Sequence, residues 1–310
     1  MEGPQGRLLV TGANGHLGRR LIERVLREDR APGVEAVVRS DRAAAVLEPL
    51  RALGELRIHI VDPGDADALT SVGRGCTHAI HLIGILKQGP GTRYADAHEG
   101  TCSALARAAE KNAFRRIVYL SILGASVDSK NACLASKARA EQILLEAPVP
   151  TVVLRVPMVL GGEEPGARAI RAQARAGLVP LVRGGRSREQ PIDADDVTQA
   201  ILRGLSLPGL GPEILALAGP ESLPRRELLE RAAALTGGRP RVVALPLWLA
   251  WLFAGASELV LASPPLTRAM LGVLEQDDDV DPGQACARLE LELTPLDETL
   301  RRCLVDGARQ

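Results

Sequence analysis

The segment Arg7-Leu-Leu-Val-Thr-Gly-Ala-Asn-Gly-His-Leu-Gly18 decides the fold of this chain. Its beginning predicts a strand, and the apolar residues that follow Gly18 recur at helical spacing. Gly12 permits a tight turn, Gly15 lets backbone approach a pyrophosphate, and Gly18 allows close helix–strand packing. The helix N-terminus then offers amide groups and a positive dipole end to an anion. The candidate cofactor-binding residues of this turn are Thr11, Gly12, Asn14, Gly15, His16, Leu17 and Gly18.

Strand-like and helix-like segments alternate from this turn onward. Helical segments are expected near residues 65–72, 95–112 and 133–146. The further strands are expected at Val34–Arg39, Leu56–Val61, His78–Ile83, Arg116–Ser121 and Thr151–Val156. Such alternation predicts a parallel sheet covered by helices on both faces, which is an α/β, doubly wound Rossmann fold.

The composition of the chain changes after Pro157, where glycine and proline become frequent. We expect residues 1–160 to form the dinucleotide-binding Rossmann core, with residues 189–206 returning to it and Ile192–Val197 rejoining the sheet. Residues 161–188 and 207–310 are expected to form a smaller, mostly helical lobe, with one strand candidate at Ile214–Ala218.

Composition excludes several classes of protein. Lys plus Arg equals Asp plus Glu, 38 each, and a chain of zero net charge lacks the basic excess of a nucleic-acid binder. The five cysteines contain no C-x-x-C pair, so we expect a reducing compartment, no disulfide framework and no metal site. The glycine-rich turn begins within a dozen residues of Met1, so we expect no signal peptide and a cytoplasmic location.

The end of the second predicted strand indicates which dinucleotide binds. An acidic residue there would accept the ribose 2′-hydroxyl of NAD, but this chain has Arg39-Ser40, with Arg42 just beyond. A guanidinium suits a 2′-phosphate, so NADP is preferred and NAD stays open. The alternative is that these arginines are solvated surface charge. Asp62, after the third strand, is placed either to meet the adenine or to cap a helix.

Residues 242–262 are apolar over a length that would cross a bilayer, and they hold both tryptophans. Pro246 and Glu258 interrupt the run. A buried helix of the smaller lobe is the favoured interpretation. A surface that contacts a membrane or a protein partner, and a true membrane span, are the alternatives.

Several segments carry a resemblance to a known family. They are Thr11–Gly18, Ser121–Ala125, Lys137, Arg155–Pro157 and Gln190–Val197, followed by Pro264–Arg268 and the acidic stretch before Val280–Pro282. In these residues the chain resembles the extended and atypical short-chain dehydrogenase/reductases, which include NAD-dependent epimerase/dehydratase-like proteins. Within them it is most similar to the group of the nucleotide-binding accessory subunit of respiratory complex I.

The resemblance implies a set of catalytic positions. Family members that catalyse use a Ser, a Tyr and a Lys four residues after the Tyr, in which the Tyr moves a proton and the Lys lowers its pKa. Ser121 and Lys137 match, but Cys133 stands at the Tyr position. A thiol at Cys133 is a doubtful proton donor because its side chain is shorter than a phenol.

The resemblance also implies further contacts. Leu82 and Gly84 end the fourth strand, where the family lines the nicotinamide ribose, and Lys137 holds that ribose. Pro157, Met158 and Val159 resemble the loop that meets the nicotinamide amide. Arg188 lies near a diphosphate-binding position of nucleotide-sugar enzymes, although a solvated loop explains it equally well.

The sequence therefore predicts an NADP(H)-binding protein whose acid–base role has been lost. The nucleotide would be structural or sensing, or would serve a narrow redox step, in a setting near membranes and quinones. The alternative is an active NAD(P)-dependent reductase, or an epimerase or dehydratase that acts on a nucleotide sugar.

Overall fold

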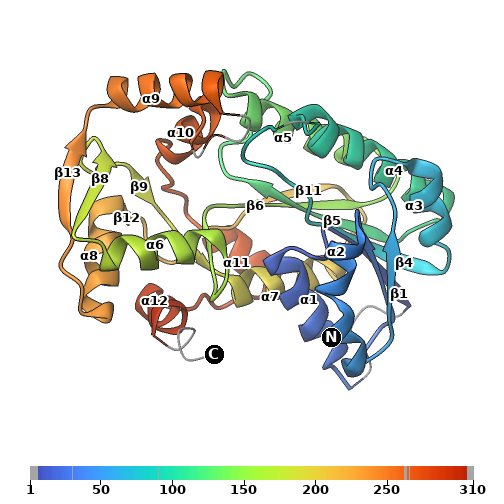
Figure 1. The fold of residues 1–310 in the computed structure, drawn as a ribbon. Helices are drawn as coiled ribbons and strands as arrows, with labels where there is room; N and C mark the ends of the chain where they lie inside the picture. Colours follow the sequence, from blue (N-terminus) through green and yellow to red (C-terminus); the bar gives the residue numbers. More distant parts are fainter. Residues whose placement is uncertain (1–5, 30, 90, 262–263, 265, 306–310) are drawn as a thin grey trace.

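A seven-stranded parallel sheet forms the centre of the computed structural model, which describes residues 6–29, 31–89, 91–261, 264 and 266–305 (Figure 1). The strands in sheet order are β11 (Glu213–Ala216), β6 (Thr151–Val156), β5 (Arg116–Ile122), β4 (Cys76–His81), β1 (Arg7–Thr11), β2 (Val34–Val38) and β3 (Leu56–Ile60). Each pairs with its neighbour in parallel. The predicted α/β, doubly wound Rossmann fold is confirmed.

Helices cover both faces of this sheet because its strands are apolar on both sides. Leu8 and Val10 of β1 join one buried cluster, and Leu9 between them joins another. The helices of the first face are α1 (His16–Leu26), α7 (Ala194–Leu205) and α11 (Gly283–Leu289). The helices of the second face are α3 (Ala66–Val72), α4 (Thr101–Lys111) and α5 (Ala132–Leu145). Three short helices complete this part: α2 (Asp41–Ala45), η1 (Glu48–Leu53) and the π-helix η2 (Asp96–Gly100).

A second group of elements packs around its own buried cluster beside the sheet (Figure 1). Its helices are α6 (Pro165–Arg175), α8 (Arg225–Thr236) and α12 (Leu296–Leu304). Strand β8 (Leu178–Val182) pairs in parallel with β13 (Arg241–Leu245). Two-residue strands link the groups: β7 (Val159–Leu160), β9 (Arg188–Glu189), β10 (Ile192–Asp193) and β12 (Leu223–Pro224). The mostly helical character predicted for the C-terminal region is confirmed.

Two predictions about which segments join the main sheet need correction. Ile192–Val197 does not rejoin the main sheet: β10 pairs only with β7, and α7 starts at Ala194. The physical reason is a helix cap, because the Asp193 carboxylate accepts the amide of Asp195. In addition, β11 is an edge strand of the main sheet and α11 covers the first face of that sheet, although residues 207–310 were expected in the smaller lobe. The division into two lobes otherwise stays a prediction.

The buried helix expected from residues 242–262 is wrong. Residues 241–245 form β13, and the helix α9 (Leu247–Val260) turns its large side chains to the surface. Trp248, Leu252 and Leu259 are 67%, 63% and 85% exposed, whereas the small Ala250 and Ala254 are buried. Small residues face inward because they let α9 pack closely on α10 (Arg268–Leu274). Residue 262 lies outside the described residues.

The described helices were also tested as membrane spans. None of them combines the length and the apolar character that crossing a bilayer requires. The expectation about the first residues of the chain concerns residues 1–5, which lie outside the described part.

Candidate functional site

The glycine turn lies at the carboxyl end of β1, where the sheet order reverses direction between β1 and β4. Gly12 has a φ of +74°, and a Cβ there would lie 3.0 Å from the carbonyl carbon of Leu82. A Cβ at Gly18 would lie 2.5 Å from the carbonyl oxygen of Gly12, so α1 can approach the turn only without a side chain there. No side chain caps α1 at Gly15. The first-turn amides of the helix are therefore open to an anion.

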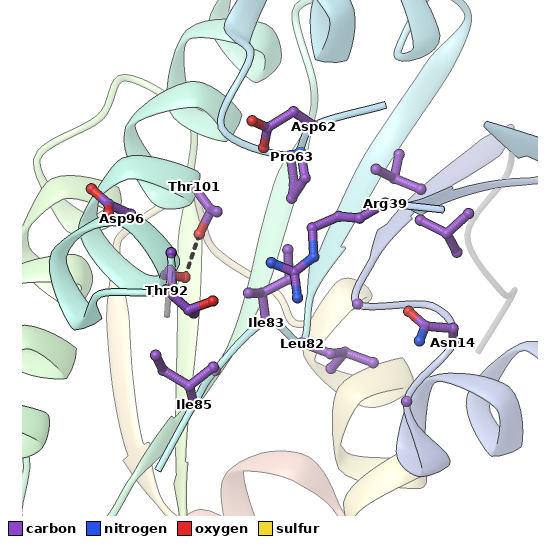
Figure 2. A pocket seen from close by; sticks show the side chains of 17 residues that line it. Asn14, Arg39, Asp62, Pro63, Leu82, Ile83, Ile85, Thr92, Asp96 and Thr101 are labelled. Atoms are coloured by element: carbon purple, nitrogen blue, oxygen red, sulfur yellow. Dashed lines mark hydrogen bonds between the residues drawn. The ribbon is translucent and has the colours of Figure 1, made fainter. Parts of the chain in front are cut away.

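A cavity of about 320 Å³ opens over this turn, at the ends of β1, β2 and β4 (Figure 2). Seven of the predicted cofactor-binding residues line it: Gly12, Asn14, Gly15, Arg39, Asp62, Leu82 and Gly84. Sequence reasoning missed other lining residues, among them Pro63, Ile83, Thr92 and Asp96. Thr92 and Asp96 come from the segment that leads into η2, and no local motif marks them.

Arg39 follows β2 and extends into this cavity, as Figure 2 shows. Within the described part of the chain it forms no ion pair or hydrogen bond, and it is exposed. Ser40 instead caps α2, where its hydroxyl accepts the amide of Ala43 at 3.3 Å. Asp62 accepts the amide of Gly64 at 2.9 Å, and the cap of α3 is Asp65. Arg39 is thus a guanidinium at the end of β2 that lines the cavity and has no partner among the described residues.

Other residues of the turn have structural partners. The hydroxyl of Thr11 is buried and lies 2.6 Å from Nδ1 of His81. Nδ1 of His16 lies 2.9 Å from the guanidinium of Arg19. His16 and Leu17 sit with Gly18 in the first turn of α1, beside the cavity rather than among its lining residues.

Lys137 lies directly beneath Gly84. A Cβ at Gly84 would be 3.1 Å from its Nζ, so the glycine leaves room between the lysine and the cavity. Nζ donates to the Tyr119 hydroxyl at 2.9 Å and to the Leu120 carbonyl at 3.0 Å. Burial lowers the pKa of Lys137 to about 8. The structure therefore pairs Lys137 with Tyr119, a buried tyrosine on β5, and not with a group at the Tyr position of the family.

The other two catalytic positions are also engaged. Ser121 donates to the carboxylate of Glu141 at 2.5 Å, and that carboxylate is bound by Arg155. Cys133 is buried, its Sγ lies 3.5 Å from the Ile85 carbonyl oxygen, and burial raises the pKa of its thiol. A protonated thiol turned to backbone is a poor proton relay. Glu141 follows Lys137 by one helical turn, a spacing that was the only sequence signal for this partner.

Pro157, Met158 and Val159 line a second cavity, of about 520 Å³, and not the first. Arg188 lines neither: its guanidinium binds Ser222 and lies 3.9 Å from Asp279. Among the described residues no group of three or more His, Cys, Asp or Glu side chains is arranged to hold a metal ion.

A family model described as NAD(P)H-binding matches residues 12–206. This range includes the glycine turn and the residues that line the first cavity. The chain belongs to this family. Its first part is therefore an NAD(P)H-binding domain.

Curated relatives of this NAD(P)H-binding protein carry different names. It is 28% identical over 265 residues to the mitochondrial NADH dehydrogenase [ubiquinone] 1 alpha subcomplex subunit 9 of Arabidopsis thaliana, with 83% of this chain and 64% of that subunit covered. This chain thus spans less than two thirds of that relative's length. It is 26% identical over 243 residues to the ceramide reductase of Caulobacter vibrioides, with 78% and 74% covered.

Solved structures agree on the fold. A dTDP-glucose 4,6-dehydratase from Streptomyces venezuelae, solved with NAD bound, superposes with a TM-score of 0.75 at 19% identity, with 98% of this chain and 97% of that chain covered. This likeness places the NAD(P)H-binding protein among the epimerase/dehydratase-like folds and says nothing of its substrate.

Proposed function

We propose that this NAD(P)H-binding protein holds NADP(H) in a site that has lost the tyrosine proton relay. The nucleotide then serves a structural or sensing role, or a narrow redox step, close to a membrane. The observation that supports the choice of NADP is Arg39, which extends into the cavity at the end of β2 and has no ion-pair or hydrogen-bond partner in the described part of the chain. The observation that carries the loss of the relay is Cys133, buried against backbone at the Tyr position.

Replacing Arg39 by alanine is expected to weaken NADPH binding about 10- to 100-fold, the effect of losing a charge-assisted hydrogen bond of about 1.5–3 kcal/mol. NADH has no 2′-phosphate, so its affinity is expected to stay the same. Calorimetric titration of both dinucleotides measures this. The matched control is Arg42→Ala, which removes an exposed arginine that does not line the cavity. Equal losses for both dinucleotides would show that Arg39 does not select NADP.

Replacing Cys133 by alanine is expected to leave NADPH affinity and any dinucleotide-dependent turnover within about twofold of the native values. The reason is that the thiol stays protonated and lies outside the lining of the dinucleotide cavity. Steady-state kinetics and titration test this together. If alanine abolishes a turnover that the native protein shows, Cys133 takes part in the chemistry.

The alternative is an active NAD(P)-dependent reductase, and the relative named ceramide reductase favours it over a sugar epimerase or dehydratase. A nucleotide-sugar enzyme needs a cation for the diphosphate, and the guanidinium of Arg188 is bound to Ser222. Cys133→Tyr tests this alternative. It recreates the Tyr–Lys spacing, so a rise in turnover supports a latent reductase site, and no rise supports the structural or sensing role.

The exposed face of α9 supports a position at a membrane surface. Both tryptophans lie on this 14-residue helix, and Trp248, Leu252 and Phe253 are more than half exposed. Tryptophan suits the interface between water and acyl chains. At the N-terminal end of α9, a cavity beside Pro246 is lined by the exposed Arg183 and Arg186 and also by Glu275 and Asp277. Nε of Arg183 lies 3.7 Å from Glu275, so the charges there are balanced. From its exposed apolar face we propose that α9 lies in the surface of a membrane, with a protein partner as the alternative.

Replacing Leu252 by glutamate is expected to weaken binding to phosphatidylglycerol vesicles by about tenfold or more, because a charge cannot enter the acyl region. Vesicle flotation measures this. The control is Leu210→Glu, which changes a leucine away from α9 that is 80% exposed, against 63% for Leu252. A native protein that does not float with vesicles would refute the membrane proposal and leave the protein partner.

A further inference from the structure

The second cavity is larger than the dinucleotide cavity and has a different lining. It lies between α6, α10 and the loop Pro157–Val159, and its volume is about 520 Å³. Its walls are chiefly apolar, with Met158 on one side and Met270 and Val273 of α10 on another. Leu86 and Leu274 also line it, and they are 50% and 46% exposed. A volume in this range fits a small organic ligand.

The charged groups of this cavity reject an anion. Arg225 is the single cation among its described lining residues, and it is bound to both carboxylate oxygens of Glu189 at 2.6 and 2.8 Å. Its other nitrogen donates to Gln173 at 2.9 Å. Glu164 and Asp278 add two further carboxyl groups. Because no free cation faces the cavity within the described chain, a diphosphate would meet carboxylates there without a compensating positive charge.

Asp278 is one of the polar groups of this cavity that remain available, together with the buried Oε2 of Glu164, which has no hydrogen-bond partner among the described residues. Its backbone amide donates to the Arg188 carbonyl at 3.0 Å, and its backbone carbonyl accepts from Ser222 at 2.6 Å. Its carboxyl group has no hydrogen-bond or ion-pair partner among the described residues. Burial, together with nearby Glu189 and Asp277, raises the pKa of Asp278 to about 6. The carboxyl group is therefore an ionised acceptor at pH 7.5, held in place by its backbone, beside apolar walls.

We propose that this cavity binds an apolar molecule, neutral or cationic, whose hydroxyl or amino group donates to the carboxylate of Asp278, and that it excludes nucleoside diphosphates. The inference rests on the proposed function in one respect: Ile85 lines the dinucleotide cavity and the next residue, Leu86, lines this one, so the two cavities adjoin. It goes beyond that function because it assigns the class of molecule that the dinucleotide would meet.

The test uses Nile red, a neutral apolar fluorophore, titrated into the full chain at pH 7.5. Ala169 lies on the exposed side of α6 and lines the cavity, so Ala169→Trp is expected to fill it and to weaken Nile red binding about tenfold or more. Ala172→Trp is the matched control, because Ala172 is equally exposed on α6 and does not line the cavity. If both variants bind Nile red as the native protein does, the dye sits elsewhere, such as on α9, and the proposal is overturned. Leu274→Gln, a polar change at the same cavity, serves as a second variant should Ala169→Trp not fold.

Displacement of Nile red tests which polar group of a ligand the cavity accepts. Decanol and decylamine are expected to displace the dye at about tenfold lower concentration than decanoate, and UDP-glucose is expected not to displace it. Asp278→Asn should reduce the difference between the concentrations at which decanol and decanoate displace the dye. Displacement by UDP-glucose, or equal displacement by decanol and decanoate in the native protein, overturns the assignment. An NADPH titration on the same samples separates the two proposals, since either ligand can bind while the other fails.

Discussion

Replacing Arg155 by alanine is expected to lower the free energy of unfolding by about 3 kcal/mol. Arg155 lies near the carboxyl end of β6. Its Nε lies 3.0 and 3.2 Å from the two carboxylate oxygens of Glu141. The side chain of Glu141 is only 2% exposed, whereas that of Arg155 is 26% exposed. Alanine would leave a buried carboxylate with Ser121 as its remaining partner. The expected value is at the low end for a buried pair because Arg155 reaches solvent.

Urea unfolding, followed by circular dichroism, measures this loss. The control is the double variant Glu141→Met, Arg155→Met, which removes both charges and keeps similar volume. It is expected to recover most of the lost stability, since an apolar pair replaces a buried ion pair at little cost. A loss below about 1 kcal/mol in Arg155→Ala would show that the pair behaves as a surface ion pair.

Acidification from pH 6.5 to 5.5 is expected to lower the free energy of unfolding by about 2 kcal/mol. Burial lowers the pKa of His81 and of His98 to about 3, and that of His78 to about 4. The unfolded chain binds protons on these histidines below pH 6.5 while the folded chain does not, so stability falls as the pH falls. Asp278 acts in the opposite direction, because its raised pKa lets the folded chain take up a proton near pH 6.

His98 shows the physical reason most clearly. It lies in the π-helix η2, where its Nε2 accepts the amide of Ile85 at 3.1 Å. Its Nδ1 is buried and has no hydrogen-bond partner among the described residues. Protonation of Nε2 would break this hydrogen bond. His98→Gln keeps an acceptor but cannot titrate, so it should reduce the slope of stability against pH by up to about 1.4 kcal/mol per unit. An unchanged slope would mean that His98 is not buried neutral.

The sheet and its phosphate-binding turn could be predicted because their signals are local. Apolar runs and helical periodicity repeat within a few residues, and each predicted strand of the first half lies within two residues of its observed bounds. Gly12 and Gly18 are equally local, since a positive φ and a close backbone contact each require glycine at one position. The position of Arg39 at the cavity could also be predicted, because the end of β2 has a fixed place in this topology.

The partners of the catalytic positions could not be predicted in this way. Ser121 and Lys137 match a family pattern, but their hydrogen bonds go to Glu141 and Tyr119, which depend on how α5 packs on β5. Long-range packing also separates Pro157 from the first cavity and places it in the second, where α6 and α10 supply the remaining walls.

The environment of the apolar stretch at residues 242–262 could not be predicted from the sequence either. Its composition is visible in the sequence, but whether it is buried depends on which side chains find a neighbour in the folded chain. The small residues of α9 pack on α10 and the large ones do not, so Leu259 is 85% exposed where a buried helix was expected. The sequence by itself determined the doubly wound sheet and the glycine turn, because local sterics and periodicity specify both. Only the tertiary structure decided the state of Cys133, the apolar cavity and the exposed face of α9, because each depends on contacts between segments far apart in the chain.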